Sequence, residues 1–343
     1  MAFTTINKST DYMNTKLYTG NGSTNTAQTG VGFQPDWTWI KERSSTSSHI
    51  ITDAVRGANN SLSSNLTSGN AVETQSLMSF DSDGFTVGSG GGVNENSQTY
   101  AAWNWKANGT GSSNTDGDIT STVSTNTTSG FSIVKYTGNG STNQTVGHGL
   151  GSVPKLIINK QLTTQNWFVY HHSIGNTDVL KLNTTDAKTT SSAWNNTTPT
   201  SSVFTIGTSS STNVSGEDFI NYCFAEKTGF SKFGSYVGNA NADGTFIYTG
   251  FKPSFIMIKR TDTTGDWLMK DNKRPTVQNP VTSLLYPNQS YAEATGVNDA
   301  DFLSNGYKIR TTGTAENASG GTYIYMAFGQ PIVSTNNVIA TAR

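Results

Sequence analysis

The sequence has 343 residues and a formal net charge of −1, and only 13% of its residues are charged, against about 25% in an ordinary globular domain. Ser, Thr, Asn and 35 Gly take the place of the charged residues. This balance provides no basic surface for nucleic acid, and it excludes a coiled coil, which needs far more Glu, Lys, Leu and Ala.

Residues 1–15 precede the first repeated pattern and are expected to form an N-terminal arm. They lack the charged and apolar stretches of a signal peptide. No window of the chain approaches the ~18 apolar residues of a membrane-spanning helix. The single cysteine, Cys223, lies in an apolar run and is expected to be a buried small hydrophobe. The sequence therefore predicts a protein that folds in the cytosol, with neither membrane nor nucleic acid among its partners.

A threefold repeat is the main signal of the sequence. The run YTGNGSTN begins at Tyr18 and again at Tyr136, and the shorter form YVGN begins at Tyr236. Each run is followed by a proline and, six residues later, by a lysine; these are Pro35 and Lys41, Pro154 and Lys160, and Pro253 and Lys259. Ordered matches at nearly constant spacing predict three units, at residues 16–106, 134–226 and 234–330.

The segments between and after the units have their own patterns. Residues 107–133 are polar and show no apolar period, so we expect a flexible linker. The second and third units are joined by the short run KTGFSKFG and are expected to pack as a rigid pair. Residues 331–343 are expected to form a C-terminal arm, where Pro331-Ile332-Val333 suits strand addition to a partner.

Each unit has the pattern of an all-β domain. Short runs rich in β-branched and aromatic residues alternate with Gly, Asn and Asp turns, such as Asp83-Gly84. Bulky side chains recur on one face of the strand after each proline, as with Trp37 and Trp39. The expected fold is three tandem antiparallel β-sandwiches of jelly-roll or concanavalin-like type, arranged as a rigid string. Propeller blades are the alternative, but no half-unit period supports them.

Four residues are candidate contacts for a glycan or a protein interface. Trp194 lies in the polar loop SSAWNNTTP, where an exposed indole would stack on a sugar or fill an interface pocket. It would equally fit against the end of the sandwich, and the sequence does not decide between these. Lys41, Lys160 and Lys259 recur at one strand end. They are either a repeated contact to a sugar or a neighbouring subunit, or, as we favour, strand ends that discourage edge pairing.

No pattern indicates catalysis or a cofactor. His171 and His172 are adjacent strand residues that face opposite sides, which does not suit one metal ion. Residues 80–84 and 116–118 resemble calcium loops weakly, so a structural Ca²⁺ is a minor hypothesis beside hairpin turns. Carboxylate pairs that cleave glycosides have no fixed spacing, which leaves a polysaccharide hydrolase as the weakest alternative. We expect a protein that is not an enzyme.

The second unit resembles a known family. Residues 130–140, GFSIVKYTGNG, then 146–151, VGHGLG, and Pro154-Lys155 resemble repeat modules in virion structural proteins of marine tailed bacteriophages. The resemblance extends over about residues 16–330 and carries no known catalytic residue. It implies a virion component, made in the host cytoplasm and exposed on the particle surface as head decoration, fibre, knob or spike.

Two functions follow as hypotheses. The leading one is a virion structural protein whose partners are other capsid or tail proteins and, in adhesion, a host surface glycan. The alternative is a lectin-like receptor-recognition protein. The sequence does not specify head or tail, the copy number, the receptor, the anchoring terminus or whether the chain forms a homo-oligomer.

Overall fold

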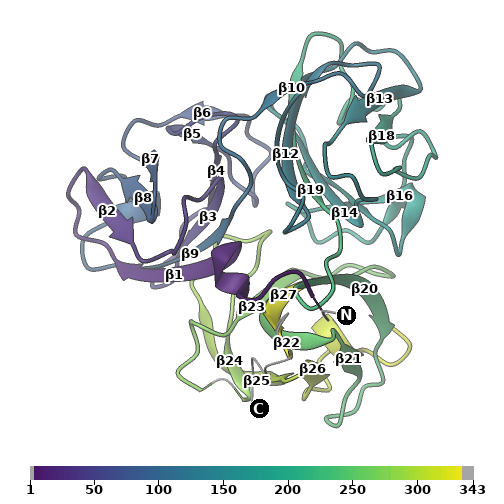
Figure 1. The fold of residues 1–343 in the computed structure, drawn as a ribbon. Helices are drawn as coiled ribbons and strands as arrows, with labels where there is room; N and C mark the ends of the chain where they lie inside the picture. The colour runs from purple at the N-terminus through teal and green to yellow at the C-terminus, as the bar shows by residue number, and fades with distance from the viewer. Residues whose placement is uncertain (1–3, 278, 334–343) are drawn as a thin grey trace.

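The chain folds almost entirely into antiparallel β-strands that pack as layered sandwiches (Figure 1). The structure, a computed structural model, describes residues 4–277 and 279–333. The helical elements in this part are single turns: η1 (Ser9–Asp11), α1 (Gly91–Asn94) and α2 (Thr314–Asn317). An antiparallel β-sandwich architecture, as the strand patterns predict, is confirmed.

One strand order occurs three times along the chain. The first group has the sheet β1 (Met13–Thr19), β9 (Thr99–Trp105), β3 (Trp37–Glu42) and β4 (Ile50–Asp53), in that order. The second has β12 (Phe131–Thr137), β19 (Asp218–Phe224), β14 (Leu156–Gln161) and β15 (Phe168–His171). The third has β20 (Ser231–Val237), β27 (Thr322–Pro331), β22 (Phe251–Arg260) and β23 (Trp267–Asp271). We call these the inner sheets.

A second layer covers each inner sheet. In the first group it is β2 (Thr26–Thr29), β8 (Gly84–Val87) and β7 (Leu77–Asp81), and in the second it is β13 (Gln144–Gly147) and β18 (Val203–Ile206). In the third it is β21 (Phe246–Tyr248), β26 (Gly306–Ile309), β25 (Ala294–Leu303) and β24 (Val281–Leu284). An apolar core fills each sandwich. β5 (Asn60–Ser61) and β6 (Ala71–Val72) form a separate pair. The second inner sheet continues at one edge with β16 (Gly175–Lys181) and β17 (Thr189–Thr190), and at the other edge with the two strands of residues 112–126.

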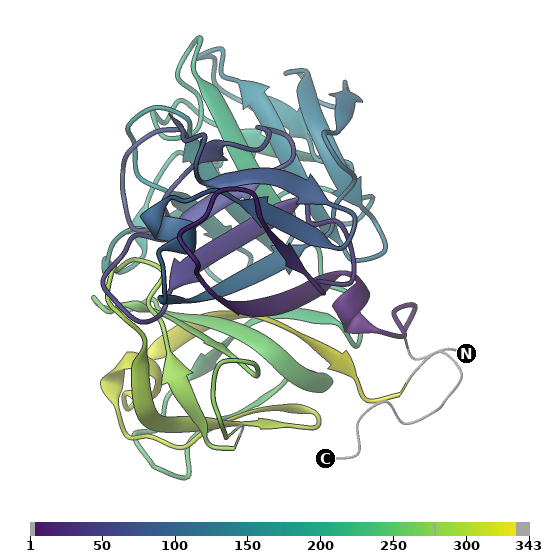
Figure 2. The ribbon, with the colours of Figure 1, turned by 90° about the vertical axis from the view of Figure 1, so that its left-hand side faces the viewer.

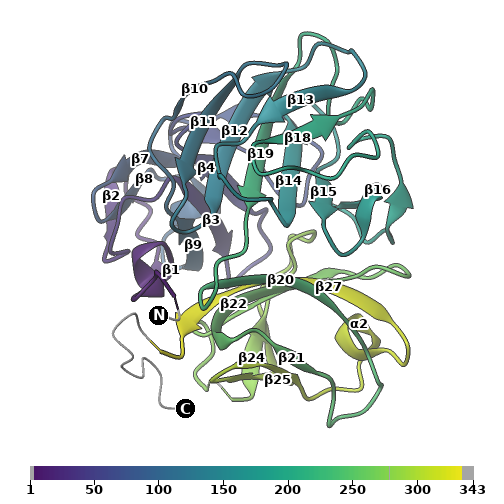
Figure 3. The same ribbon diagram turned by 45° about the vertical axis from the view of Figure 1, so that its right-hand side comes forward.

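The three inner sheets bury their other faces against one another. Trp37 stacks on Tyr222 with ring centroids 4.5 Å apart, which joins the first group to the second. Trp105 meets Phe255 of the third group edge to face, and Phe224 meets Phe328 in the same way, at 5.6 and 5.8 Å. The sandwiches therefore surround one shared aromatic core. Figure 1 shows the three groups arranged around a common centre and not as a string. Figure 3 shows the inner sheet of the third group facing the other two, with β24 and β25 on its far side.

Residues 107–133, expected as a flexible linker, instead belong to a sheet. β10 (Ser112–Asn114) pairs with β11 (Ser121–Asn126), which pairs with β12 along its length. The buried Asp36 carboxylate accepts hydrogen bonds from the amides of Ala107 and Gly109, at 2.6 and 3.0 Å. The prediction of a flexible linker was wrong because polar residues such as threonine occur in edge strands as well as in linkers, and composition alone does not distinguish the two.

The two ends of the described chain lie together. The expected N-terminal arm already contains η1 and the first residues of β1, and Ile6 is buried in the shared core. Gln330 accepts a hydrogen bond from the Ser9 amide and donates one to the Asn7 carbonyl, at 3.1 and 3.0 Å. Figure 2 shows both ends on the same side of the molecule. Most of the expected C-terminal arm, residues 334–343, lies outside the described residues.

Candidate functional site

The repeated YTGN run acts as a lock within each group. The tyrosine hydroxyl donates a hydrogen bond to a backbone carbonyl in the turn before the last inner strand. The pairs are Tyr18 to Val93, Tyr136 to Thr212 and Tyr236 to Glu316, at 2.7, 2.6 and 2.8 Å. The same tyrosines stack on Tyr100, Phe219 and Tyr323, with centroids 4.8–5.2 Å apart.

The glycine and asparagine of the run complete this lock. A Cβ on the glycine would lie 2.2–2.4 Å from a carbonyl oxygen of the facing turn; the pairs are Gly20 with Glu95, Gly138 with Val214 and Gly238 with Ala318. The backbone N–H of the asparagine in the run donates a hydrogen bond to the side-chain oxygen of a second, buried asparagine. The pairs are Asn21 with Asn94, Asn139 with Asn213 and Asn239 with Asn317, at 2.9–3.0 Å. The main sequence motif is thus part of the scaffold.

Lys41, Lys160 and Lys259, the predicted contact residues, are fully buried. Their ammonium groups donate to backbone carbonyls, and burial lowers the pKa of each to about 8. Lys160 reaches Thr67 O of the first group at 3.2 Å, and Lys259 reaches Thr185 O of the second at 3.1 Å. Lys160 and Lys259 therefore join neighbouring groups, whereas Lys41 binds the carbonyls of Glu42 and Ser45 within its own group. None of the three presents its charge to a surface ligand.

Trp194, the other predicted contact, is 1% exposed. Its ring packs edge to face against Tyr170 and Phe204 in the core of the second sandwich, at 5.8 and 6.5 Å. The reading in which the indole fits against the sandwich is the one that the structure supports. A sugar at the surface does not reach this ring.

Polar contacts close the three groups into a cycle. The last residues of β4, β15 and β23 are Asp53, His171 and Asp271, and each forms a hydrogen bond with another group. Asp53 accepts from the Tyr222 hydroxyl, His171 binds the Tyr325 carbonyl, and Asp271 accepts from the Trp103 indole, at 2.8, 3.2 and 2.9 Å. A second cycle of contacts uses the residue just before, or at, the start of the same three strands. The side-chain N–H of each donates to a backbone carbonyl of another group. The pairs are Trp167 with Ser63, Trp267 with Lys181 and His49 with Tyr286, at 2.9, 2.9 and 3.0 Å. Burial lowers the pKa of His49 and His171 to about 3.

The carboxylates of the weak calcium patterns hold turns. Asp83 accepts from the Gly30 and Gly32 amides at 3.0 and 2.7 Å, and Asp118 accepts from the Thr145 amide and hydroxyl. Across residues 4–277 and 279–333 there is no cluster of three or more His, Cys, Asp or Glu side chains placed to bind a metal ion. The same residues include no helix long and apolar enough to cross a membrane.

A buried charged cluster sets the third sandwich apart, and it is the candidate functional site. Lys270 Nζ lies 2.7 Å from Glu316 Oε1 and 3.3 Å from Asp299 Oδ2. The Tyr307 hydroxyl lies 3.0 Å from Lys270 Nζ and donates to Glu316 Oε2 at 3.0 Å. The side chains of Lys270 and Glu316 are 1% and 2% exposed. Burial raises the pKa of Glu316, although Lys270 opposes this.

The cluster borders solvent through a pocket of about 290 Å³, with Asp266, Tyr286, Asp299 and Glu316 among its lining. Sequence reasoning missed this site because its residues lie far apart in the chain and match no spacing rule. One signal was available: Glu316 directly precedes the repeated Asn317, at a position where the first two units have the uncharged Val93 and Thr212.

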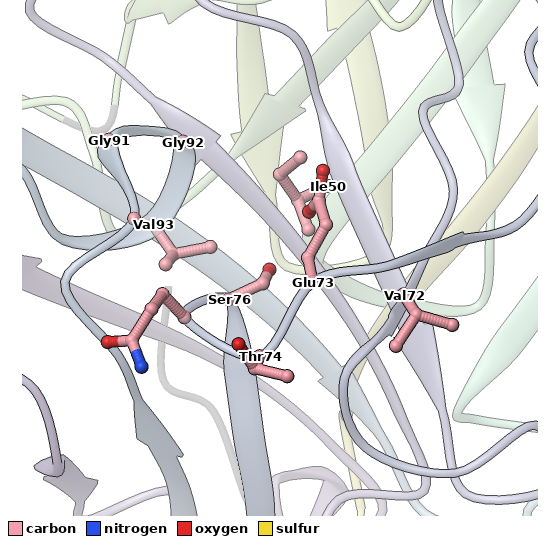
Figure 4. Close-up of a pocket in the computed structure, with 10 residues that line it drawn as sticks. Ile50, Val72, Glu73, Thr74, Ser76, Gly91, Gly92 and Val93 are labelled. Atoms are coloured by element: carbon pink, nitrogen blue, oxygen red, sulfur yellow. The ribbon is translucent and has the colours of Figure 1, made fainter.

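A second pocket, of about 380 Å³, lies on the first sandwich (Figure 4). Ile50 and Val93 line it from different elements, and Ser76 lies between them in this view. Gly91 and Gly92 also line it. The pocket brings together no group of catalytic or ligand-binding charges comparable to the Lys270 cluster.

Taken together, these contacts define an all-β protein whose sandwiches share one core and whose repeated motifs maintain the fold. A family model described as a domain of unknown function (DUF7483) matches residues 8–331, and the chain belongs to this family. No curated protein and no solved structure matches the chain.

Proposed function

We propose that this protein is a structural component of the outer surface of a bacteriophage virion and not an enzyme. The observation that carries the proposal is the shared aromatic core, which makes one rigid body of three similarly built sandwiches. Rigid bodies of this kind suit assembly contacts, because little conformational entropy is lost when they bind. The resemblance of residues 130–155 to phage virion modules supports the same function.

We further infer that the three groups are tandem repeats of one sandwich. The identical inner strand order and the three equivalent YTGN locks support this inference. Such a chain places three similar surfaces around one centre, as a homotrimer would with three chains.

The chain ends and the exposed loops lie at opposite ends of the inner strands, and this suggests how the protein is oriented on a particle. Ser9 and Gln330 meet near the start of β1 and the end of β27. The loops 21–25, 139–143 and 239–243 follow the opposite ends of β1, β12 and β20 and are fully exposed. In our proposal the face with the chain ends attaches to the virion, and the face with these loops, rich in Asn, Ser and Thr, is presented outward.

The glycan-binding alternative now lacks its candidate residues, because Trp194 and the three lysines are buried. Adhesion would have to use the exposed loops. We therefore keep the structural role as the proposal and treat adhesion as a property to measure afterwards.

The test is the location of the protein on purified particles, with gold-labelled antibodies raised against the folded chain. We expect label on intact virions, either over the head or along the tail. A matched antibody against the loop 139–143 should label intact particles, whereas one against residues 4–12 should label only disrupted particles. If mass spectrometry of purified particles detects none of this protein, the proposal is overturned.

A further inference from the structure

The charged cluster of the third sandwich interrupts an otherwise apolar core. Lys270 lies opposite Ile256 in the β22–β23 pairing, as Thr52 lies opposite Thr38 in the first group and Tyr170 opposite Ile157 in the second. The first two groups thus have uncharged residues where the third has its buried lysine. A buried ion pair contributes little net stability, because desolvation of both charges offsets their attraction. Packing alone does not account for a lysine with two carboxyl groups at this position.

The cluster brings together an amine, on Lys270, and two carboxyl groups, on Asp299 and Glu316. Lys270 contacts both carboxyl groups, but the two differ in their surroundings. Both carboxyl groups line the pocket, but the side chain of Glu316 is only 2% exposed and accepts hydrogen bonds on both oxygens, from Lys270 and from Tyr307. Asp299 is 20% exposed and lies on the pocket, so a molecule released from its carboxyl group has a path to solvent.

We propose that Lys270 Nζ and Asp299 Cγ form an intramolecular isopeptide bond, with Glu316 as the proton carrier. The neutral amine attacks the Asp299 carboxylic acid, and a new N–C bond forms. Glu316 takes a proton from the attacking nitrogen and returns one to the departing hydroxyl, so the Asp299 C–O bond breaks and one water molecule leaves. Atoms and electrons balance with no oxidant or reductant.

The geometry favours both the proton transfer and the equilibrium. The reaction requires a proton to pass from Lys270 Nζ to a carboxyl group, and Glu316 Oε1 lies 2.7 Å from this nitrogen. Burial also raises the pKa of Glu316, which suits a group that must carry a proton in both directions. Groups held in contact react as if at about 10⁵–10⁸ M, which compensates for the unfavourable condensation of free amines and acids in water.

The bond would join the two layers of the third sandwich. Lys270 belongs to β23 of the inner sheet, and Asp299 belongs to β25 of the outer layer. A covalent link between them restricts the unfolded chain, as a disulfide does. This inference concerns the chemistry of the chain itself and goes beyond the proposed virion role.

Intact mass spectrometry of the denatured full-length protein tests the proposal directly. We expect the wild-type chain to weigh about 18 Da less than its sequence, the mass of one water. After protease digestion, the peptides that contain Lys270 and Asp299 should appear as one branched species. A folded wild-type chain at its full sequence mass would overturn the proposal, and so would a link from Lys270 to Glu316.

Three variants and one control complete the experiment. Lys270→Arg and Asp299→Ala should each have the full sequence mass, and Glu316→Gln should form the bond much more slowly or not at all. Lys188→Arg alters a partly exposed ion pair with Asp178 and should keep the mass deficit. A mass deficit that persists in Asp299→Ala would contradict the assignment. Near-ultraviolet circular dichroism establishes whether each variant is folded. If a variant does not fold, the mass of the wild-type chain still decides the proposal.

Discussion

At the scale of single residues, the repeated YTGN run combines three contacts into one lock. The tyrosine binds a carbonyl, the asparagine amide binds a buried side chain, and the glycine lets two backbones touch. The glycine is required here because Gly20 faces Glu95 O at a distance where no side chain fits. The motif recurs because each sandwich needs the same close approach.

Replacement of this glycine should therefore destabilise the fold. Gly20→Ala is expected to lower the free energy of unfolding by about 1–3 kcal/mol, the usual cost of forcing extra atoms into a packed site. Chemical denaturation followed by tryptophan fluorescence measures the change. Gly91→Ala is the matched control, because its Cβ would meet only the Glu95 side chain at 3.7 Å. Equal stability of the two variants would contradict this account of the lock.

The buried ionisable residues predict how stability depends on pH. Burial lowers the pKa of Lys41, Lys160 and Lys259 to about 8, below the usual 10.5. The unfolded chain therefore binds more protons between pH 8 and 10.5, and the free energy of unfolding should rise with pH across this window. Above pH 10 the buried Tyr222, whose pKa is raised well above 10 by burial, opposes the rise. Thermal melts in Lys160→Met should show a smaller rise than wild type, and an identical rise would show that Lys160 does not contribute.

The acid side has a slope of the same sign and the same physical cause, burial of a group that carries a proton when exposed. Because burial lowers the pKa of His49 and His171 to about 3, from 6.5, the unfolded chain binds protons in this range that the folded chain does not. The contribution of these two histidines to stability is therefore full above pH 6.5 and is lost as the pH falls from 6.5 toward 3. The same melts, extended to acid, check this part of the profile.

At the scale of elements, residues 107–133 show why polar composition is a weak guide. β10 and β11 form the edge of the second inner sheet, and the buried Val123 helps to hold them there. The Asp36 carboxylate fixes the start of the segment through two amides. Burial within the sandwich raises the pKa of this carboxyl group, although both hydrogen bonds oppose the shift.

Limited proteolysis tests this placement. Proteinase K should leave residues 107–133 of the native protein intact, because paired strands do not fit a protease active site without local unfolding. Asp36→Ala should make the segment at least several-fold more susceptible, since it removes both contacts. Rapid cleavage of wild type into one fragment of about a third of the chain and one of about two thirds would instead indicate a mobile linker.

At the scale of the whole molecule, the shared core makes the three sandwiches depend on one another. Trp37, Phe224 and Phe255 come from different groups and are buried among the same aromatic rings. An isolated group would expose this face to water, at about 25 cal/mol for each Å² of apolar surface. The groups are therefore parts of one cooperative structure.

Calorimetry should record this dependence as a single unfolding transition for the full chain. Trp37→Ala is expected to lower the melting temperature of the whole transition, because truncation of a buried tryptophan costs about 3–5 kcal/mol. Leu66→Ala, at a residue 42% exposed, is the control and should have little effect. Three separate transitions in wild type would show that the sandwiches unfold independently.

The sequence by itself was sufficient for the all-β architecture. Alternation, turn residues and constant spacing are local properties, and they are strong in runs such as Trp37 to Ile40. The same patterns predicted a hairpin turn at Asp83-Gly84; the hairpin joins β7 to β8, one residue earlier, with Gly84 as the first residue of β8. The family to which the chain belongs carries no further statement of function.

Only the tertiary structure decided which faces are buried and which charges meet. In β3 and β14 every residue is buried, so the inner sheets have two apolar faces, and the second one needs another sheet to cover it. The burial of Lys41 follows from that packing, whereas Trp194 is buried in the core of the second sandwich. No local pattern records either contact. Lys270, Asp299 and Glu316 meet for the same reason: contacts between distant strands depend on how sheets stack, and sequence spacing does not encode that stacking.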